Sequence, residues 1–348
     1  MLSGRQLLAV AMVLVLVTTG AVGVMGSVTA QSETTDCSFP LTVTDATGEE
    51  VEIEEPPESV VTLAPSAAQT MWEIGAQEQV VGISDRGTYL EGADDKTIVS
   101  GEEGFVSTET VIAEEPDLVL APDIINDDKV TQLREAGLTV YNFDAATSME
   151  DIVEKTRLTG QITNSCEGAD ARADEMENSL EIVRTAVEGE DRPTVLYLLG
   201  GEFTAGSGTF INGVIETAGG TNIAAEAGIE GYAQISREVV ANESPEYLVV
   251  SNEAPEVVPN APAYNNTDAV QNDQIITVNA NYLNQPAPRT IQVVEDFASE
   301  WHPDAYESAA TSLSEDTTVT TTATDAPGFG MITALLALVG TVFLTRRD

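Results

Sequence analysis

Lysine and histidine are scarce in this sequence, and their scarcity excludes several kinds of function. The 348 residues include 14 lysines and arginines against 58 aspartates and glutamates, which gives a formal net charge of −44. Such a charge repels nucleic acid, so a nucleic-acid-binding function is excluded. A single histidine and two cysteines cannot make a tetrahedral metal site. A zinc or manganese receptor would need several histidines, so the single histidine argues against that function.

Motifs of the common enzyme classes are also missing. The chain has neither a Gly-x-Ser-x-Gly nucleophile motif nor a phosphate-binding Gly-x-x-x-x-Gly-Lys. The one histidine, His302, lies near the C-terminal end of the predicted folded body. The glycines at 200–201 and 206–208 predict turns. We therefore expect no catalytic residue, no metal and no cofactor.

The acidic excess indicates the solvent in which the protein works. An acid-rich, lysine-poor surface is typical of proteins in near-saturating salt, because salt screens the repulsion that opposes folding. A disordered acidic chain is the alternative, but 42% of the residues are hydrophobic and they recur in regular patterns. We therefore expect a folded protein of a salt-loving archaeon.

The N-terminal residues predict export. Residues 1–30 combine a short cationic start, an apolar run at 7–17 and small residues before Ala30, which is typical of a secretory signal peptide. A membrane-spanning helix is the alternative, but the apolar run is shorter than the ~20 residues that a bilayer requires.

The C-terminal residues predict a surface anchor. Residues 311–325 are rich in threonine and predict a solvated stalk. The segment 326–348, with Pro327, Gly328 and Phe329, an apolar tail and a final arginine pair, resembles the PGF-CTERM sorting signal of archaeal surface proteins. In that signal a lipid replaces the removed tail. A plain membrane helix would also leave the body on the outer face of the cell membrane.

Cys37 and Cys166 are the only cysteines. In an exported protein, oxidising conditions favour a disulfide over the alternative of two free thiols. We predict that the bond joins an N-terminal segment, residues 31–57, to a long helix.

The body predicts two similar halves. Residues 58–147 alternate β-branched strand patterns, as at 59–63, 80–83 and 116–121, with helical segments. Residues 148–190 have apolar residues at helical spacing, with turn-forming residues only around 164–168, and the alternation restarts in residues 191–310. This order predicts an α/β fold with two doubly wound lobes, whose mainly parallel sheets are joined by a single long helix.

A short internal repeat relates the two halves. Glu109 lies seven residues before Pro116, and Glu238 lies seven residues before Pro245. In both places the glutamate is on a predicted short helix that leads into a buried strand. This self-similarity favours a duplicated unit over coincidence.

Several segments together resemble the periplasmic cobalamin and ferric-siderophore binding proteins. They are residues 60–66 (VVTLAPS), 80–83 (VVGI), 115–121 (EPDLVLA) and 236–238 (SRE). The resemblance extends over residues 57–305 and implies the class III periplasmic-binding-protein fold. It also implies a solute-binding protein of an ABC importer, with permease and ATPase subunits as partners. Each lobe of that family presents one glutamate to permease arginines, and the motifs match these to Glu109 and Glu238.

The resemblance places the ligand in a cleft between the lobes, where strand ends converge. Aromatic faces suit a corrin ring and amides suit its amide rim. Each candidate also has a structural alternative, because aromatics are common in cores and amides in turns. Matching the motifs gives nine ligand-binding candidates: Ser66, Tyr89, Phe203, Tyr232, Asn281, Tyr282, Leu283, Asn284 and Gln285.

The resemblance leaves the ligand open between cobalamin and an anionic iron chelate. Ferric siderophores and haem favour arginine in the cleft, and only Arg86 and Arg289 lie near the candidate loops. This scarcity favours a large, nearly neutral corrinoid such as cobalamin, with a siderophore or haem receptor as the alternative. A structural or adhesive surface protein would explain the export signals but not the repeated glutamate motif.

Overall fold

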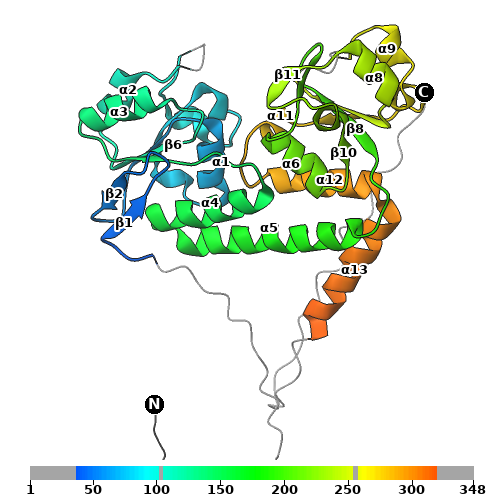
Figure 1. The fold of residues 1–348 in the computed structure, drawn as a ribbon. Coiled ribbons are helices and arrows are strands. Elements are labelled where there is room, and N and C mark those ends of the chain that lie inside the picture. The colour runs from blue at the N-terminus through cyan, green and yellow to red at the C-terminus, as the bar shows by residue number, and fades with distance from the viewer. Residues whose placement is uncertain (1–36, 102–104, 254–257, 320–348) are drawn as a thin grey trace, which may run out of the picture. The chain divides into compact units, whose positions relative to one another are not determined.

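The computed structural model describes residues 37–101, 105–253 and 258–319 (Figure 1). The predicted signal peptide and the Pro327, Gly328 and Phe329 motif lie outside these residues. The first part of the predicted stalk is helical, because α13 (Pro303–Val319) continues through it. In the part of the chain that the structure describes, no helix has both the length and the apolar character of a membrane span.

The first lobe is built on a five-stranded sheet in the order β5-β4-β3-β6-β7, with every neighbouring pair parallel. All residues of β3, β6 and β7 are buried, as expected for strands covered on both faces. The strands are β3 (Val60–Thr62), β4 (Val80–Ile83), β5 (Thr97–Ile98), β6 (Leu118–Ala121) and β7 (Val140–Asn142). The helices are α1 (Pro65–Glu73), α2 (Thr108–Ala113) and α3 (Asp127–Glu135), with 3₁₀ turns at Gln77–Gln79, Asp85–Gly87 and Ala93–Asp95.

The second lobe has a four-stranded parallel sheet in the order β10-β8-β12-β13. Its strands are β8 (Thr194–Leu198), β10 (Thr221–Asn222), β12 (Tyr247–Ser251) and β13 (Ile275–Val278). A separate antiparallel pair joins β9 (Phe203–Ala205) to β11 (Tyr232–Gln234). The helices are α6 (Phe210–Thr217), α7 (Ile223–Glu226), α8 (Arg237–Glu243), α9 (Pro262–Asn265), α10 (Asp268–Gln271), α11 (Ala280–Leu283), α12 (Thr290–Trp301) and α13.

The predicted connecting segment contains two helices, α4 (Met149–Ile162) and α5 (Cys166–Val187), of which α5 is the single long helix of the expected fold. Asn164, with φ 59°, interrupts the helical path between them. The helices pack closely side by side (Figure 1), since a Cβ at Gly160 would lie 2.2 Å from that of Ala169. Buried side chains of α4 and α5 belong to the cores of both lobes, which ties the lobes together.

The repeat inferred from sequence recurs in three dimensions. Asp117 accepts hydrogen bonds from the backbone N–H and hydroxyl of Ser59, each at 2.9 Å, at the entry to β3. Glu246 does the same for Thr194 at the entry to β8, at 2.8 and 3.3 Å. Each carboxylate follows a proline and holds two neighbouring strands in register. The two sheets therefore share one local construction.

The predicted disulfide is confirmed. Cys37 and Cys166 are bonded, with their Cα atoms 5.9 Å apart. Cys166 is the first residue of α5, and Cys37 precedes the antiparallel hairpin of β1 (Leu41–Thr44) and β2 (Glu50–Ile53). The bond thus fixes the N-terminal segment to the long helix.

A buried ion pair holds the same hairpin to the first sheet. The Asp45 side chain is fully buried; its carboxylate pairs with Arg134 and accepts hydrogen bonds from the backbone of Thr47 at 2.9 Å and of Asn142 at 3.2 Å. Burial alone would raise the pKa of Asp45, but hydrogen bonds from Thr47, Arg134 and Asn142 and the charge of Arg134 outweigh it and lower the pKa.

Asp45→Asn should lower the free energy of unfolding by about 1 to 3 kcal/mol, because Arg134 loses its buried partner. Since the folded-state pKa lies below the unfolded value near 4, the stabilisation is present above that value and is lost as pH falls through the folded pKa. Chemical denaturation of the wild type and the variant, at pH 7 and at pH 3, measures the loss of stability and its dependence on pH. The exposed Glu52→Gln is the control, and equal stability of the Asp45 variant at pH 7 would contradict the prediction.

Candidate ligand-binding cleft

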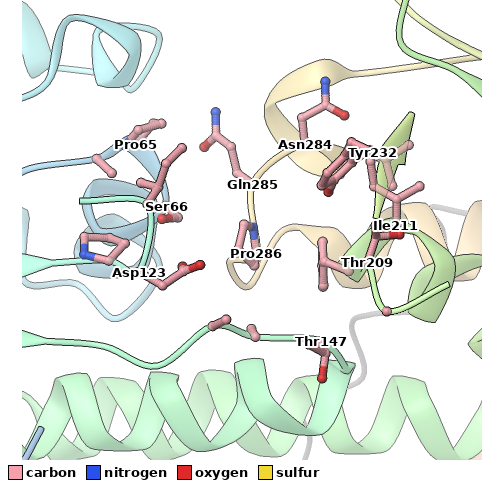
Figure 2. Close-up of a pocket in the computed structure, with 18 of the residues that line it drawn as sticks. Pro65, Ser66, Asp123, Thr147, Thr209, Ile211, Tyr232, Asn284, Gln285 and Pro286 are labelled. Carbon is pink, nitrogen blue, oxygen red and sulfur yellow. The ribbon is translucent and has the colours of Figure 1, made fainter. Parts of the chain in front are cut away.

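A cavity of about 520 Å³ lies at the carboxyl ends of strands from both sheets. Residues 64–66, 122–124 and 145–147 line one side and follow β3, β6 and β7. Leu199, which follows β8, and residues 208–211 at the start of α6 line the other side. Figure 2 shows Pro65, Ser66 and Asp123 on one side and Thr209, Ile211 and Tyr232 on the other. Ligands of open α/β sheets bind at such strand ends.

Apolar side chains dominate the cavity and reach its rim. Leu283 is fully buried in the wall, whereas Ile124 and Tyr232 are 78% and 51% exposed. Large side chains that stay exposed at the edge of a cavity are suited to contact a ligand or a partner protein. The polar groups are few: the hydroxyls of Ser66, Tyr232 and two threonines, the carboxyl of Asp123, and two amides.

The two amides enter the cavity from the segment that follows α11. Asn284 and Gln285 extend into the space between Ser66 and Tyr232 (Figure 2). The Asn284 Oδ1 accepts a hydrogen bond from the Tyr197 hydroxyl at 2.7 Å. Tyr197 is fully buried on β8, and burial is the main reason that its pKa rises to about 12. The phenol therefore stays protonated and remains a donor to Asn284.

Five of the nine ligand-binding candidates line the cavity: Ser66, Tyr232, Leu283, Asn284 and Gln285. Two others lie behind it, since the Tyr89 hydroxyl donates to Gln285 Oε1 at 3.1 Å and Asn281 Oδ1 accepts from Gln285 Nε2 at 3.2 Å.

Phe203 and Tyr282 do not line the cavity. Phe203 is on β9 and is 41% exposed. Tyr282 packs against the core of the second lobe, with the Arg289 guanidinium 5.7 Å from the centre of its ring. The sequence placed both residues in loops near the cleft but gave no information on which way their side chains face.

The loops after β6 and β7 and the start of α6 also line the cavity, and none of their residues was predicted to bind the ligand. Residues 122–124, 145–147 and 208–211 contain few aromatics or amides, so residue type did not select them. Their position directly after predicted strands was the available signal, because the carboxyl ends of parallel strands share one edge of a sheet.

No arginine, lysine or histidine is among the described residues that line the cavity. Arg289 instead donates to Glu73 at 2.7 Å, and Arg172 pairs with the same carboxylate at 3.1 Å. Arg86 is exposed in a 3₁₀ turn and does not line the cavity. His302 is buried, with its Nε2 3.3 Å from the Gly219 carbonyl oxygen. The cavity is therefore poorly suited to bind an anionic chelate by charge.

The two glutamates of the repeat occupy matching positions. Glu109 is the second residue of α2 and Glu238 is the second residue of α8, and both are exposed. Each helix begins after a serine that caps it: Ser107 accepts from the Thr110 N–H at 3.3 Å and Ser236 from the Val239 N–H at 3.2 Å. Each lobe thus presents one carboxylate at the same place in its repeat.

Several known proteins that are similar to this chain are named as binding proteins. A family model described as "Periplasmic binding protein" matches residues 60–282. The chain is 40% identical over 330 residues to the "Cobalamin-binding protein" of Halobacterium salinarum, which covers 89% of each chain. Among solved structures it is similar to the periplasmic vitamin B12 binding protein BtuF of Vibrio cholerae, at 25% identity and a TM-score of 0.63, covering 73% of this chain and 98% of that one. It is also similar to the periplasmic heme-binding protein RhuT from Roseiflexus sp. RS-1, at 26% identity and a TM-score of 0.64, covering 72% and 99%.

Proposed function

The chain belongs to the periplasmic binding protein family, and from this premise we propose that it is the solute-binding component of an ABC importer that binds cobalamin or a related corrinoid. The observation that carries the proposal is the cleft itself, which combines apolar walls with amides and has no cationic side chain among the described lining residues. Such a cleft suits a large, nearly neutral ligand with an amide rim. The 40% identity to a protein named for cobalamin binding supports the same ligand.

Haem is the second candidate because of one residue. Tyr232 is the only lining side chain, among those that the structure describes, of a type that ligates haem iron. The 26% identity to a heme-binding protein of the same fold also favours this candidate. In a cobalamin site, Tyr232 instead supplies ring area to the corrin.

Titration of the full chain with cobalamin, haem and a ferric siderophore in multimolar salt distinguishes these functions. We expect one cobalamin bound per chain and no siderophore bound, because the cavity lacks cationic groups for the anionic chelate. Tyr232→Phe should change cobalamin affinity less than about threefold, since the ring area is retained. Loss of most haem binding in the same variant would identify haem as the ligand. A structural or adhesive surface protein would bind none of the three.

The lobes correspond in this proposal to residues 58–147 and 191–310, and the exposed Glu109 and Glu238 are the contacts to permease arginines. Carboxylate and guanidinium groups form charge-assisted, bidentate pairs. Two such pairs, one on each lobe, would fix both the position and the orientation of the binding protein on the permease.

Export and a surface anchor complete the proposal. The signal-like residues 1–30 and the anchor-like residues 326–348 would place the body on the outer face of the cell membrane, next to its permease. A protein held there meets its ligand before the ligand reaches the membrane.

A further inference from the structure

A continuous set of hydrogen bonds behind the cleft begins at Gln69 of α1, a fully buried glutamine. Its Oε1 accepts from the Arg289 backbone N–H at 3.0 Å, and its Nε2 donates to the Asn281 carbonyl oxygen at 2.9 Å. A backbone N–H can only donate and a carbonyl oxygen can only accept. The two backbone partners therefore determine which end of the Gln69 amide is oxygen and which is nitrogen.

The orientation of Gln69 is passed on to the cleft. The Gln69 Nε2 also donates to the Tyr89 hydroxyl oxygen at 2.7 Å, so the Tyr89 O–H has to donate elsewhere. It donates to Gln285 Oε1 at 3.1 Å, and Gln285 Nε2 then donates to Asn281 Oδ1 at 3.2 Å. The remaining donor of Gln285 is the second hydrogen on Nε2. Gln285 lines the cavity and is 8% exposed.

Asn284 is oriented in the same sense by a separate contact. The buried Tyr197 hydroxyl donates to Asn284 Oδ1 at 2.7 Å, which uses one of the two acceptor sites of that oxygen and leaves the Nδ2 hydrogens for a ligand. In both adjacent amides the oxygen therefore accepts a hydrogen bond from a tyrosine, and amide N–H groups are available to donate to a ligand.

From this geometry we infer that Gln69 and Tyr89 position Gln285, and that Tyr197 positions Asn284, so that the cleft presents a fixed pair of amide N–H donors. The pair selects ligands that carry carbonyl or carboxylate oxygens at this edge of the cavity. This inference deepens the proposed function, on which it rests, because the peripheral amide carbonyls of a corrinoid are acceptors of this kind. Gln69 and Tyr89 act through Gln285 and need not touch the ligand.

A double-mutant cycle with cobalamin tests the inference. In Gln69→Glu the carboxylate cannot donate to Tyr89, so the Tyr89 hydroxyl donates to it and Gln285 loses the donor to its Oε1. We expect cobalamin binding about tenfold weaker, the loss of roughly one hydrogen bond to the ligand. In a Gln285→Ala background, Gln69→Glu should have no further effect. An equal loss in both backgrounds would show that Gln69 acts on the structure generally and would overturn the inference.

A matched control and a ligand-free measurement complete the test. Gln292→Glu makes the same charge change at an exposed position of α12 and should leave binding unchanged. Tyr89→Phe, in the ligand-free protein, should shift the side-chain amide resonances of Gln285 in an NMR spectrum and speed their hydrogen exchange about tenfold. Unchanged Gln285 resonances would overturn the inference even if the protein bound no corrinoid. Failure of the wild type to bind cobalamin would instead count against the proposed function.

Discussion

Replacing both Glu109 and Glu238 with arginine should abolish cobalamin uptake by cells and leave cobalamin binding to the purified protein unchanged. Each variant changes an expected glutamate–arginine attraction into a repulsion between like charges. Removal of one partner of such a pair costs about 2 to 5 kcal/mol, so two reversals should weaken docking by well over 10²-fold. Both side chains are exposed and neither lines the cavity, so the ligand site should be unaffected.

Single variants and a charge control make this prediction specific. Glu109→Arg or Glu238→Arg alone should reduce uptake but retain part of it, because the other lobe still docks. The control is Glu135→Arg together with Glu243→Arg, which makes the same charge change on exposed residues of α3 and α8. Radiolabelled cobalamin uptake, measured beside cobalamin titration, distinguishes transport from binding. Normal uptake by the double variant would contradict the docking role of both glutamates.

The fold could be predicted from sequence because its local patterns agree with one another. The buried run predicted at residues 116–121 contains β6, which begins at Leu118, and the equal spacing of Glu109 and Glu238 from their prolines corresponds to two copies of one local structure. The prediction of the connecting segment was less complete: apolar spacing predicted helix over residues 148–190 with turn-forming residues only around 164–168. In the structure the helix is interrupted at Asn164, which has φ 59°. Asparagine tolerates that conformation, and spacing alone does not reveal it.

The site was harder to predict because side-chain direction depends on tertiary packing. Asn284 and Gln285 line the cavity, whereas Tyr282 in the same short segment packs against the core. Residue type favoured all three equally. Gln69 was not a candidate at all, since its role depends on backbone groups more than 200 residues away in sequence. Contacts between residues so far apart along the chain produce no local pattern in the sequence.

Replacing Cys37 and Cys166 with serine should lower the free energy of unfolding by about 4 to 5 kcal/mol. The bond closes a loop with a sequence separation of 129 residues, and the entropy that a disulfide removes from the unfolded chain grows with loop length. A body of this size has an unfolding entropy that corresponds to about 2 °C per kcal/mol, so the melting temperature should fall by roughly 8 to 10 °C. Calorimetry in multimolar salt measures the change. An unchanged melting temperature would show that the bond does not contribute to stability.

The place of the disulfide in the fold predicts a second, local effect. The hairpin of β1 and β2 belongs to the first lobe's core through Val51 and Ile53, and the disulfide is its covalent tie to α5. If the bond acts only on the unfolded chain, hydrogen exchange should accelerate equally in all strands of the serine variant. If it also holds the hairpin, exchange should accelerate more in β1 and β2 than in β8 and β12. The buried Asp45–Arg134 pair is an independent contact of the hairpin. Combining Asp45→Asn with the serine variant should therefore further increase hydrogen exchange in β1 and β2 relative to β8 and β12.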